Sequence, residues 1–333
     1  MTRAAAMPAL RRFAPLAALL AVVLAVALLG ALGPELLRRR VIFALVDLIA
    51  VVGLYVFVGN SGVLSFGSVA FMAIGAYVSA LLTMPAAAKM MFLPALWLPL
   101  RSAAWPPLSG PLAGGVAAAV MAALLGWPLM GLSGISASIA TFALLVIVNV
   151  VIGNWTAVTG GQQSLMGLPP SSSLGAVLAW AAIALILAFA YGESRSALLL
   201  RASREDAVAA RASGVPIRRH RLLAFVLSGF LSGAAGALLG HLVGMLRADS
   251  YSIDLTFLVV AMLVVGGMHS LTGAVAGTFA IALVAELLRR VEAGVALPWL
   301  GTLQAPAGAG DAVLALLMLL VLLLRPAGLA GRR

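Results

Sequence analysis

The amino-acid sequence predicts an all-α, polytopic integral membrane protein with about nine or ten transmembrane segments, some of them short or broken. Hydrophobic residues make up 63% of the 333 residues and charged residues only 9%, and the mean hydropathy is +1.15. A soluble domain is about half apolar and about a quarter charged. A soluble core also stops growing near about 250–300 residues. Soluble enzymes and disordered chains are therefore excluded, and residues 1–333 are treated as one transmembrane domain.

The first element is an apolar run over 13–33 that follows a short basic stretch. Its length suits a membrane-spanning helix of about 20 residues. A cleaved signal peptide fits less well, because no clear cleavage site precedes Arg38. Further apolar runs are predicted as membrane segments at 41–58, 64–83, 108–131, 134–152, 174–191, 221–245, 255–267, 270–290 and 311–325.

The runs 255–267 and 270–290 are separated only by Met268 and His269, within a glycine-containing stretch. A break at membrane depth is tolerated where the backbone lines a cavity or is buried in protein. Broken helices of this kind often mark the substrate path of a transporter. The alternative is one long kinked or tilted helix.

Two stretches between the runs are predicted as external loops. Residues 84–107 carry five prolines, which break helices, so an ordered loop is favoured over a membrane segment. Residues 153–173 are polar and include Thr159, Gly160 and Gly161.

The stretch 192–221 differs from the rest of the chain because it holds seven arginines and three acidic residues. Basic residues gather on the cytoplasmic side of membrane proteins, so we place this stretch in the cytoplasm. Counting membrane segments outward from this stretch places both termini in the cytoplasm as well. The arginine triplet 38–40 then lies outside the cytoplasm. A re-entrant first or second segment would reverse the N-terminus.

The net charge of +11 is better explained by membrane edges than by nucleic acid, since no basic stretch is interleaved with stacking aromatics. Cysteine is absent, which excludes disulfides and thiolate metal sites. Lys89 is the single lysine and lies in no phosphate-binding loop, so this chain is not itself a P-loop ATPase. We expect no metal and no cofactor bound by this chain.

The residues that carry chemistry are sparse. The three histidines form no metal motif and are predicted to be solvated or hydrogen-bonded between helices, with a sharper role for His269 at the break. Acids within apolar runs are costly. We expect Glu286 to pair locally with Arg289 or Arg290, and Asp47 to make an interhelical hydrogen bond. No proton-relay chain, no nucleophile–base pair and no fixed charge for holding a solute is expected in the spans.

Small polar residues recur in the spans together with Gly and Ala. One interpretation is close helix packing, as in Gly229-x-x-x-Gly233; the other is a pore lined by weak hydrogen-bonding groups. A weak internal repeat relates residues 59–63 to 131–135.

Residues 204–213 are predicted to form a short surface helix. Ser203 is the expected N-cap, with Glu205 and Asp206 in the first turn, where the helix dipole favours acids. Gly214 is expected to end the helix, with Pro216 two residues later. Such a helix either docks into a groove on a partner or is simply solvated.

These residues resemble the coupling loop of ATP-binding-cassette (ABC) importer permeases, and more narrowly the branched-chain amino-acid permease family of the LivM/LivH type, with the LivM-like members as the better fit. Five further stretches support the resemblance: Gly59-Asn60-Ser61-Gly62-Val63-Leu64-Ser65-Phe66-Gly67, Asn154 to Gly161, Ser228 to Ala237, Val264 to Gly273, and Arg325-Pro326-x-Gly328-Leu329.

The resemblance implies a multi-pass inner-membrane importer subunit for branched-chain or similar small amino acids. Its implied partners are a homologous permease forming a heterodimer, two ATPase subunits that use ATP and Mg, and a periplasmic or extracellular solute-binding protein. By the same resemblance, residues 192–221 form the coupling loop, and its coupling residues are Arg204, Glu205, Asp206, Ala209, Ala210 and Gly214. The translocation path or hinge would include Asn60, Ser61, Gly62, Ser65, Gly67, Thr159, Gly160, Gly161, Gly266, Gly267, His269 and Gly273.

Urea, amides or another small solute remain alternative cargoes, and a stand-alone channel or secondary transporter is the alternative class. The chain departs from the family pattern at Ala207 and Ser213, on the surface of the coupling helix, and at Gln162 to Ser164.

Overall fold

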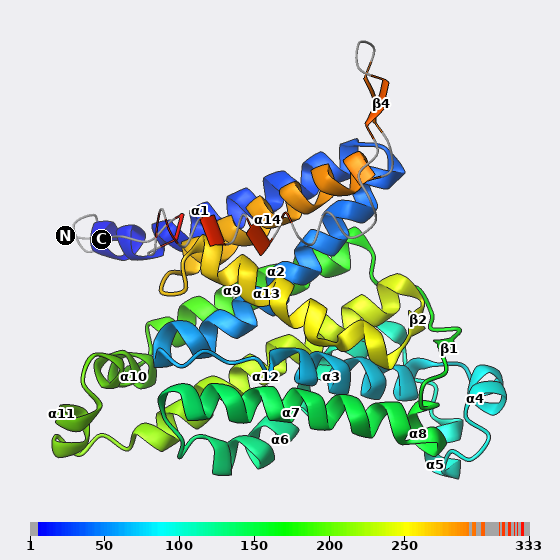
Figure 1. Ribbon diagram of the computed structural model, residues 1–333, viewed down its shortest axis with the longest axis horizontal. Coiled ribbons are helices and arrows are strands. Elements are labelled where there is room, and N and C mark those ends of the chain that lie inside the picture. The colour runs from blue at the N-terminus through cyan, green and yellow to red at the C-terminus, as the bar shows by residue number, and fades with distance from the viewer. Residues whose placement is uncertain are drawn as a thin grey trace.

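The protein is a bundle of long helices with almost no strand, as seen in a computed structural model (Figure 1). The structure describes residues 6–292, 295–297 and 301–303, and the positions 313, 315–316, 319–320, 323, 325 and 328–329. Within these residues, eight helices are long and apolar enough to cross a membrane, or nine if one bent pair is counted as a span. The all-α membrane class is therefore confirmed. The predicted segment 311–325 falls mostly outside the described residues.

The chain begins with two long helices, α1 (Ala6–Leu32) and α2 (Glu35–Ser61). The most apolar part of α2 is almost wholly buried, whereas α1 is largely exposed. Helix α2 is therefore the centre of the bundle, and α1 covers it and α9 (Leu174–Gly192) from outside.

Helix α12 (Ile217–Val243) packs against α2, α3 (Ser68–Thr83) and α6 (Gly110–Leu129). Its glycines allow this close approach. A Cβ on Gly236 would clash with the main chain of Met72, and one on Gly229 would lie 2.7 Å from the Cβ of Ala122. The small residues of this stretch thus serve helix packing, the first of the two interpretations.

Helix α3 is shorter than the predicted segment 64–83. Its sixteen residues rise about 24 Å, less than the hydrocarbon thickness of about 30 Å. The preceding residues 62–67 are not helical, and they lie along α7 (Gly134–Asn154). Helix α4 (Ala86–Phe92) then turns away from α3 by 120°.

Helices α13 (Ile253–Gly266) and α14 (Leu271–Glu292) are two separate helices. Glycine contacts pair Gly266 with Gly273 and Gly277 with Met262, so the helices run antiparallel. The predicted break is confirmed and the alternative of one long kinked helix is wrong; the break is a tight turn at Gly267, whose φ is +119°.

The loops at one end of the bundle carry short elements. These are α4, α5 (Leu98–Ser102), η1 (Pro107–Ser109), α8 (Thr156–Thr159), η2 (Ala248–Tyr251), and the antiparallel strands β1 (Leu165–Met166) and β2 (Met245–Leu246). The predicted loop 84–107 is ordered, because the buried ammonium of Lys89 donates to the carbonyls of Leu100 and Ala103 at 2.9 and 2.5 Å. A further hairpin joins β3 (Val295–Leu297) and β4 (Gly301–Leu303).

Two charged helices, α10 (Arg195–Glu205) and α11 (Ala207–Ala212), lie at the opposite end from α4 and α5 (Figure 1). The start of α1 lies at the same end as α10 and α11. The Arg38–Arg40 triplet is at the other end of α2 from the residues that contact α10.

Candidate functional site

The segment predicted as one helix at 204–213 is built from two. Helix α10 ends at Glu205 and α11 begins at Ala207. Ser203 is buried within α10 and is not an N-cap; that prediction is wrong. The N-cap is Asp206, whose carboxylate accepts from the backbone N–H groups of Val208 and Ala209 at 2.8 and 3.0 Å.

The Asp206 cap has an electrostatic consequence. The N–H groups of Ala209 and Val208 hold the pKa of this carboxyl below its ordinary value. The group is therefore ionised at neutral pH, and its charge lies at the positive end of α11. At the other end of α11 Gly214 adopts φ +80° as expected, and the Val215 N–H bonds to the Ala210 carbonyl at 3.0 Å.

Helix α11 presents a small exposed surface. Val208 is 73% exposed and Ala209 is exposed beside it, whereas Ala210 is buried against the rest of the protein. Glu205 is also 73% exposed and is held by Arg204 at 2.8 Å. An exposed valine and alanine flanked by two acidic side chains form a compact surface that another protein can contact.

Arg201 and Arg204 of α10 fasten this surface to the central helix. The Arg204 guanidinium donates to the Gly59 carbonyl at 2.9 Å, and the Arg201 guanidinium donates to the Asn60 side-chain oxygen at 3.3 Å. Gly59 and Asn60 lie in the last turn of α2, where unpaired carbonyls and the helix dipole favour cations. The motif-based prediction included Arg204 but missed Arg201.

The α13–α14 turn also lies against the end of α2. A Cβ on Gly59 would lie 2.7 Å from the Met268 carbonyl, and one on Gly62 would lie 2.5 Å from Cγ of Arg204. His269, in the same turn, is exposed. Partial desolvation and then the charge of Arg204 lower the pKa of His269, and the charge of Glu205 opposes them. The turn is thus within electrostatic reach of the charged helix.

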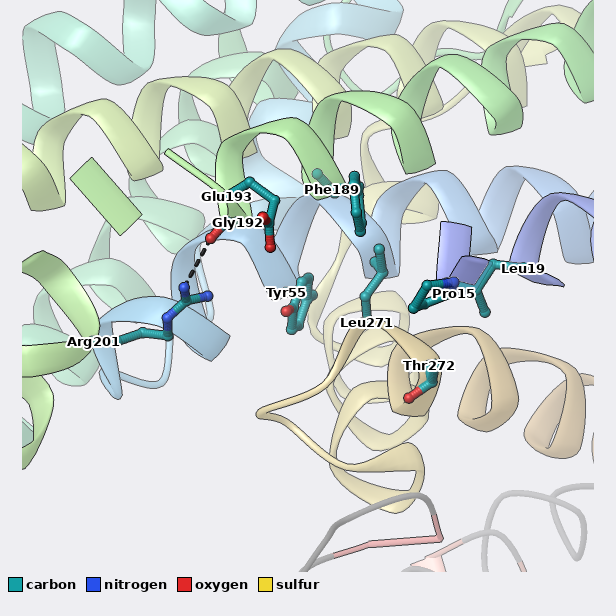
Figure 2. Close-up of a pocket in the computed structure, with 10 residues that line it drawn as sticks. Pro15, Leu19, Tyr55, Phe189, Gly192, Glu193, Arg201, Leu271 and Thr272 are labelled. Atoms are coloured by element: carbon teal, nitrogen blue, oxygen red, sulfur yellow. Dashed lines mark hydrogen bonds between the residues drawn. The ribbon is translucent and has the colours of Figure 1, made fainter. Parts of the chain in front are cut away.

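A cavity of about 230 Å³ adjoins this junction. Figure 2 shows Tyr55 and Leu271 between Arg201 on one side and Pro15 and Leu19 on the other. The Arg201 guanidinium donates to the Gly192 carbonyl at 2.8 Å (Figure 2). The charged helix α10 therefore touches the ends of α2 and α9 and borders a space that also reaches α1 and α14.

The predicted path residues Gly62, Ser65 and Gly67 lie in a partly buried, non-helical segment between α2 and α3. Gly62 has φ +70°, and the hydroxyl groups of Ser61 and Ser65 accept from the N–H groups of Val63 and Gly67. The Leu64 carbonyl accepts from Ser138 at 2.7 Å, and the Phe66 N–H donates to Thr141 at 3.2 Å. The stretches that follow the two halves of the internal repeat, 64–66 and 138–141, thus lie in contact.

The structure does not bring Thr159, Gly160 and Gly161 to this junction. They lie in the loops at the other end of the bundle (Figure 1). The Thr159 hydroxyl donates to the carbonyls of Ile152 and Trp155 at 2.6 and 2.8 Å, and both glycines have positive φ. Their observed contacts terminate α7 and shape this loop.

The chain's closing motif returns to the α13–α14 turn. The Leu329 N–H donates to the Val265 carbonyl at 2.9 Å, and a Cβ on Gly328 would lie 2.5 Å from Cα of Gly267. Sequence analysis identified both motifs and gave no sign that they touch.

The histidines behave as expected for hydrogen-bonding residues. His220 of α12 bonds Ser196 of α10 at 2.9 Å, and His241 bonds Ser79 of α3 at 2.9 Å. Within the described part of the chain, no cluster of three metal-binding side chains occurs. The arrangement is one of mechanical linkage between helices, with charged groups at the surface.

Of the predictions for the two acidic residues within the membrane helices, one is confirmed and one is wrong. Glu286 pairs with Arg290 at 3.2 Å as predicted, and also with Arg40 at 3.0 Å. Asp47 makes no hydrogen bond to any described residue, so the predicted interhelical bond is wrong. Its side chain instead lines a cavity.

Comparison with known proteins identifies the family of this chain. Residues 36–322 match the family described as "Branched-chain amino acid transport system / permease component". The chain is 28% identical over 271 residues to the high-affinity branched-chain amino acid transport system permease protein LivM of Escherichia coli, which covers 71% of this chain and 60% of that protein. The LivM of Salmonella typhimurium has the same identity and coverage.

A second kind of relative is the autoinducer 2 import system permease protein LsrC of Klebsiella pneumoniae, 33% identical over 153 residues, which cover 44% of each chain. The chain spans about 60% of the length of the LivM proteins it matches. No solved structure matches it. The family match extends over most of the chain, from the start of α2 to beyond α14, and the chain therefore belongs to the branched-chain amino acid transport system permease family.

Proposed function

We propose that this chain is the membrane-spanning permease subunit of an ATP-binding-cassette importer. It translocates branched-chain or similar small amino acids that an extracytoplasmic binding protein delivers. Two ATPase subunits hydrolyse ATP on their own chains, and a homologous permease completes the channel. The names of the LivM relatives, which describe branched-chain amino acid transport, support this cargo, and the name of LsrC, which describes autoinducer 2 import, supports import as the direction of transport.

The single observation that carries the proposal is the attachment of α10 to the end of α2. The surface of α11 is exposed at one end of the bundle, and Arg201 and Arg204 join it to the most buried helix. A partner that moves α11 therefore moves the end of α2 as well, and the α13–α14 turn lies against Gly59. Such a junction converts a local docking event into a rearrangement of packed helices.

The same assignment orients the chain. With α10 and α11 in the cytoplasm, as their arginines favour, the start of α1 is also cytoplasmic. The loops with α4, α5 and α8 then face the binding protein. Gly328 and Leu329 lie against the α13–α14 turn, which is at the same end as α10, so we also place the C-terminus on the cytoplasmic side of an inner membrane.

The decisive experiment combines two measurements on the reconstituted transporter. Transport of leucine into proteoliposomes should require ATP and the ATPase subunits; transport by this chain alone would assign it to channels or secondary transporters instead. In parallel, Glu205→Arg with Asp206→Arg should abolish co-purification of the ATPases while leaving membrane insertion intact.

A matched control reverses the same number of charges at the opposite end. Glu35→Arg with Asp249→Arg alters two exposed acids far from α11. This control should retain the ATPases. Normal co-purification with the Glu205/Asp206 double variant would overturn the coupling assignment.

A further inference from the structure

A second cavity, of about 290 Å³, lies among α2, α12, α13 and α14. It is at the end of the bundle away from α10, since Arg40 opens α2 and Arg289 lies near the end of α14. Apolar side chains form much of its wall, among them Leu239, Leu255 and Met262. Its size is near the lower limit of small-molecule sites, about 300 Å³.

Four charged side chains also line this cavity, and two of them neutralise each other. The Glu286 carboxylate lies 3.0 Å from the Arg40 guanidinium and 3.2 Å from that of Arg290. This acid has therefore two cationic partners of the protein's own. It has no need of a ligand.

Asp47 and Arg289 differ from Glu286 and Arg40 in their contacts. Among the described residues, neither makes a hydrogen bond or a contact ion pair, although Arg289 is close enough to act electrostatically on the Asp47 carboxylate. Asp47 is partly buried and Arg289 is exposed. The cavity thus holds one free anionic group and one free cationic group, separated by more than a direct contact.

The two groups lie at different depths. Asp47 follows Arg40 by two helical turns, which carries it about 10 Å further along α2 toward the middle of the bundle. Arg289 lies in the last turn of α14, near the mouth. A molecule entering from this end meets a cation first and an anion deeper inside.

The chemistry of the wall defines what fits. A carboxylate in an apolar surrounding is unfavourable unless a cation accompanies it. An ammonium group supplies that cation at Asp47, and a guanidinium such as that of Arg289 matches a carboxylate in geometry. The leucine and methionine side chains offer apolar area to an aliphatic group.

We propose that this cavity binds an aliphatic α-amino acid as its zwitterion, with the ammonium group at Asp47 and the carboxylate at Arg289. This extends the proposed function, because it gives the permease its own contact with the cargo rather than leaving selection to the delivering protein alone. It also replaces the expectation that the spans lack a fixed charge for the solute.

Binding to the full chain in detergent micelles tests the proposal without ATPases or transport. L-leucine should raise the thermal unfolding midpoint, and saturation-transfer NMR should detect its methyl groups. Leucinamide, which lacks the carboxylate, and 4-methylpentanoate, which lacks the ammonium group, should give neither signal. Equal signals from all three compounds would mean that only apolar area is recognised, and would overturn the proposal.

Two variants locate the site. Asp47→Asn and Arg289→Gln should each weaken leucine binding at least tenfold, whereas Glu35→Gln, an exposed acid at the same end and outside the cavity, should leave it unchanged. If Asp47→Asn does not fold, Arg289→Gln decides alone. Undiminished binding in Arg289→Gln overturns the assignment.

One further arm separates cargo from lipid, since phosphatidylethanolamine also carries an anion and an ammonium group. Leucine binding that persists in micelles doped with this lipid supports the amino-acid site. The opposite result has two parts: the leucine signal disappears in these micelles, and the lipid stays bound to the purified wild type but not to Asp47→Asn. That result would assign the cavity to lipid and overturn the amino-acid proposal. ATP-dependent transport with no leucine binding would refute this inference and leave the proposed function standing.

Discussion

The Arg204 guanidinium bonds the Gly59 carbonyl at 2.9 Å, and through this bond the surface helices are tied to the end of the buried helix α2. The same guanidinium bonds the Glu205 carboxylate at 2.8 Å. Arginine can serve both partners at once because its donors are fixed in a planar fork. The residue therefore connects an exposed acid to a main-chain carbonyl in the last turn of the central helix α2.

Replacing Arg204 by glutamine should separate partner docking from transport. The exposed surface at Val208 and Ala209 remains, so the ATPases should still bind within about twofold of wild type. The link to Gly59 is lost, and a hydrogen bond to a charged group contributes about 1.5–3 kcal/mol. We expect transport per ATP hydrolysed to fall about tenfold or more, measured in proteoliposomes.

Arg211→Gln is the control for that change. Arg211 lies in α11, and among the described residues its guanidinium bonds only the Ala207 carbonyl of its own helix. Its loss should leave the coupling ratio unchanged. A coupling ratio that is equally low in both variants would mean that cationic charge matters, and not the link to α2.

A charge introduced on the exposed surface of α11 should weaken binding of the ATPases. Val208→Glu places a carboxylate where an exposed valine meets the partner, and desolvating that carboxylate costs more than desolvating the valine. We expect the affinity for the ATPases to drop at least tenfold by surface-plasmon resonance. Ala202→Glu, an exposed position of α10, should have little effect, and equal losses would argue against α11 as the contact.

Substituting Gly62 and Gly214 in parallel separates the effect of a steric clash from the effect of backbone strain. Both have positive φ, where a Cβ costs roughly 1–2 kcal/mol. At Gly214 nothing lies within 4 Å of the added atom, whereas at Gly62 the Cγ of Arg204 is 2.5 Å away. Gly62→Ala should therefore lower thermal stability and also displace Arg204, reducing coupling, while Gly214→Ala should produce only the strain.

Asp206 allows capping to be distinguished from charge. Asparagine caps a helix about as well as aspartate, so Asp206→Asn should retain slow hydrogen exchange at the Val208 and Ala209 amides, whereas Asp206→Ala should lose it. Because the pKa of Asp206 is lowered in the folded protein, the stabilisation it provides is present at neutral pH and is lost as the pH falls below its ordinary value. Fast exchange in the asparagine variant would contradict the capping role.

Local signals in the sequence predicted some of these features and not others. The helix positions, the end of α11 at Gly214 and the ordered loop around Lys89 follow from apolar runs, a glycine and prolines. The split between α10 and α11 was not predicted, because Asp206 was expected in the first turn of one helix, whereas its backbone is extended and its carboxylate caps α11.

Long-range partners were beyond the reach of local patterns. Asp47 and Arg289 belong to helices far apart in the chain, and only the structure shows that they line one cavity and that neither has a contact partner among the described residues. The seating of Leu329 on Val265 is equally invisible, since neither residue carries a chemical signature. Glycine spacing gave a better guide: the predicted packing stretch in α12 does contact α3 and α6.

The pKa of His269, in the α13–α14 turn, reports whether the charges of α10 lie close to this turn. The charge of Arg204 lowers the pKa of His269 and that of Glu205 raises it. The pKa should therefore rise in Arg204→Gln and fall in Glu205→Gln, as followed by NMR of isotope-labelled histidine in nanodiscs. His241 supplies a reference within the same spectra, since it lies at the other end of α12 and bonds Ser79 of α3. Shifts of the same sign in both variants would mean that α10 moves away from the turn, and would contradict the electrostatic link between them.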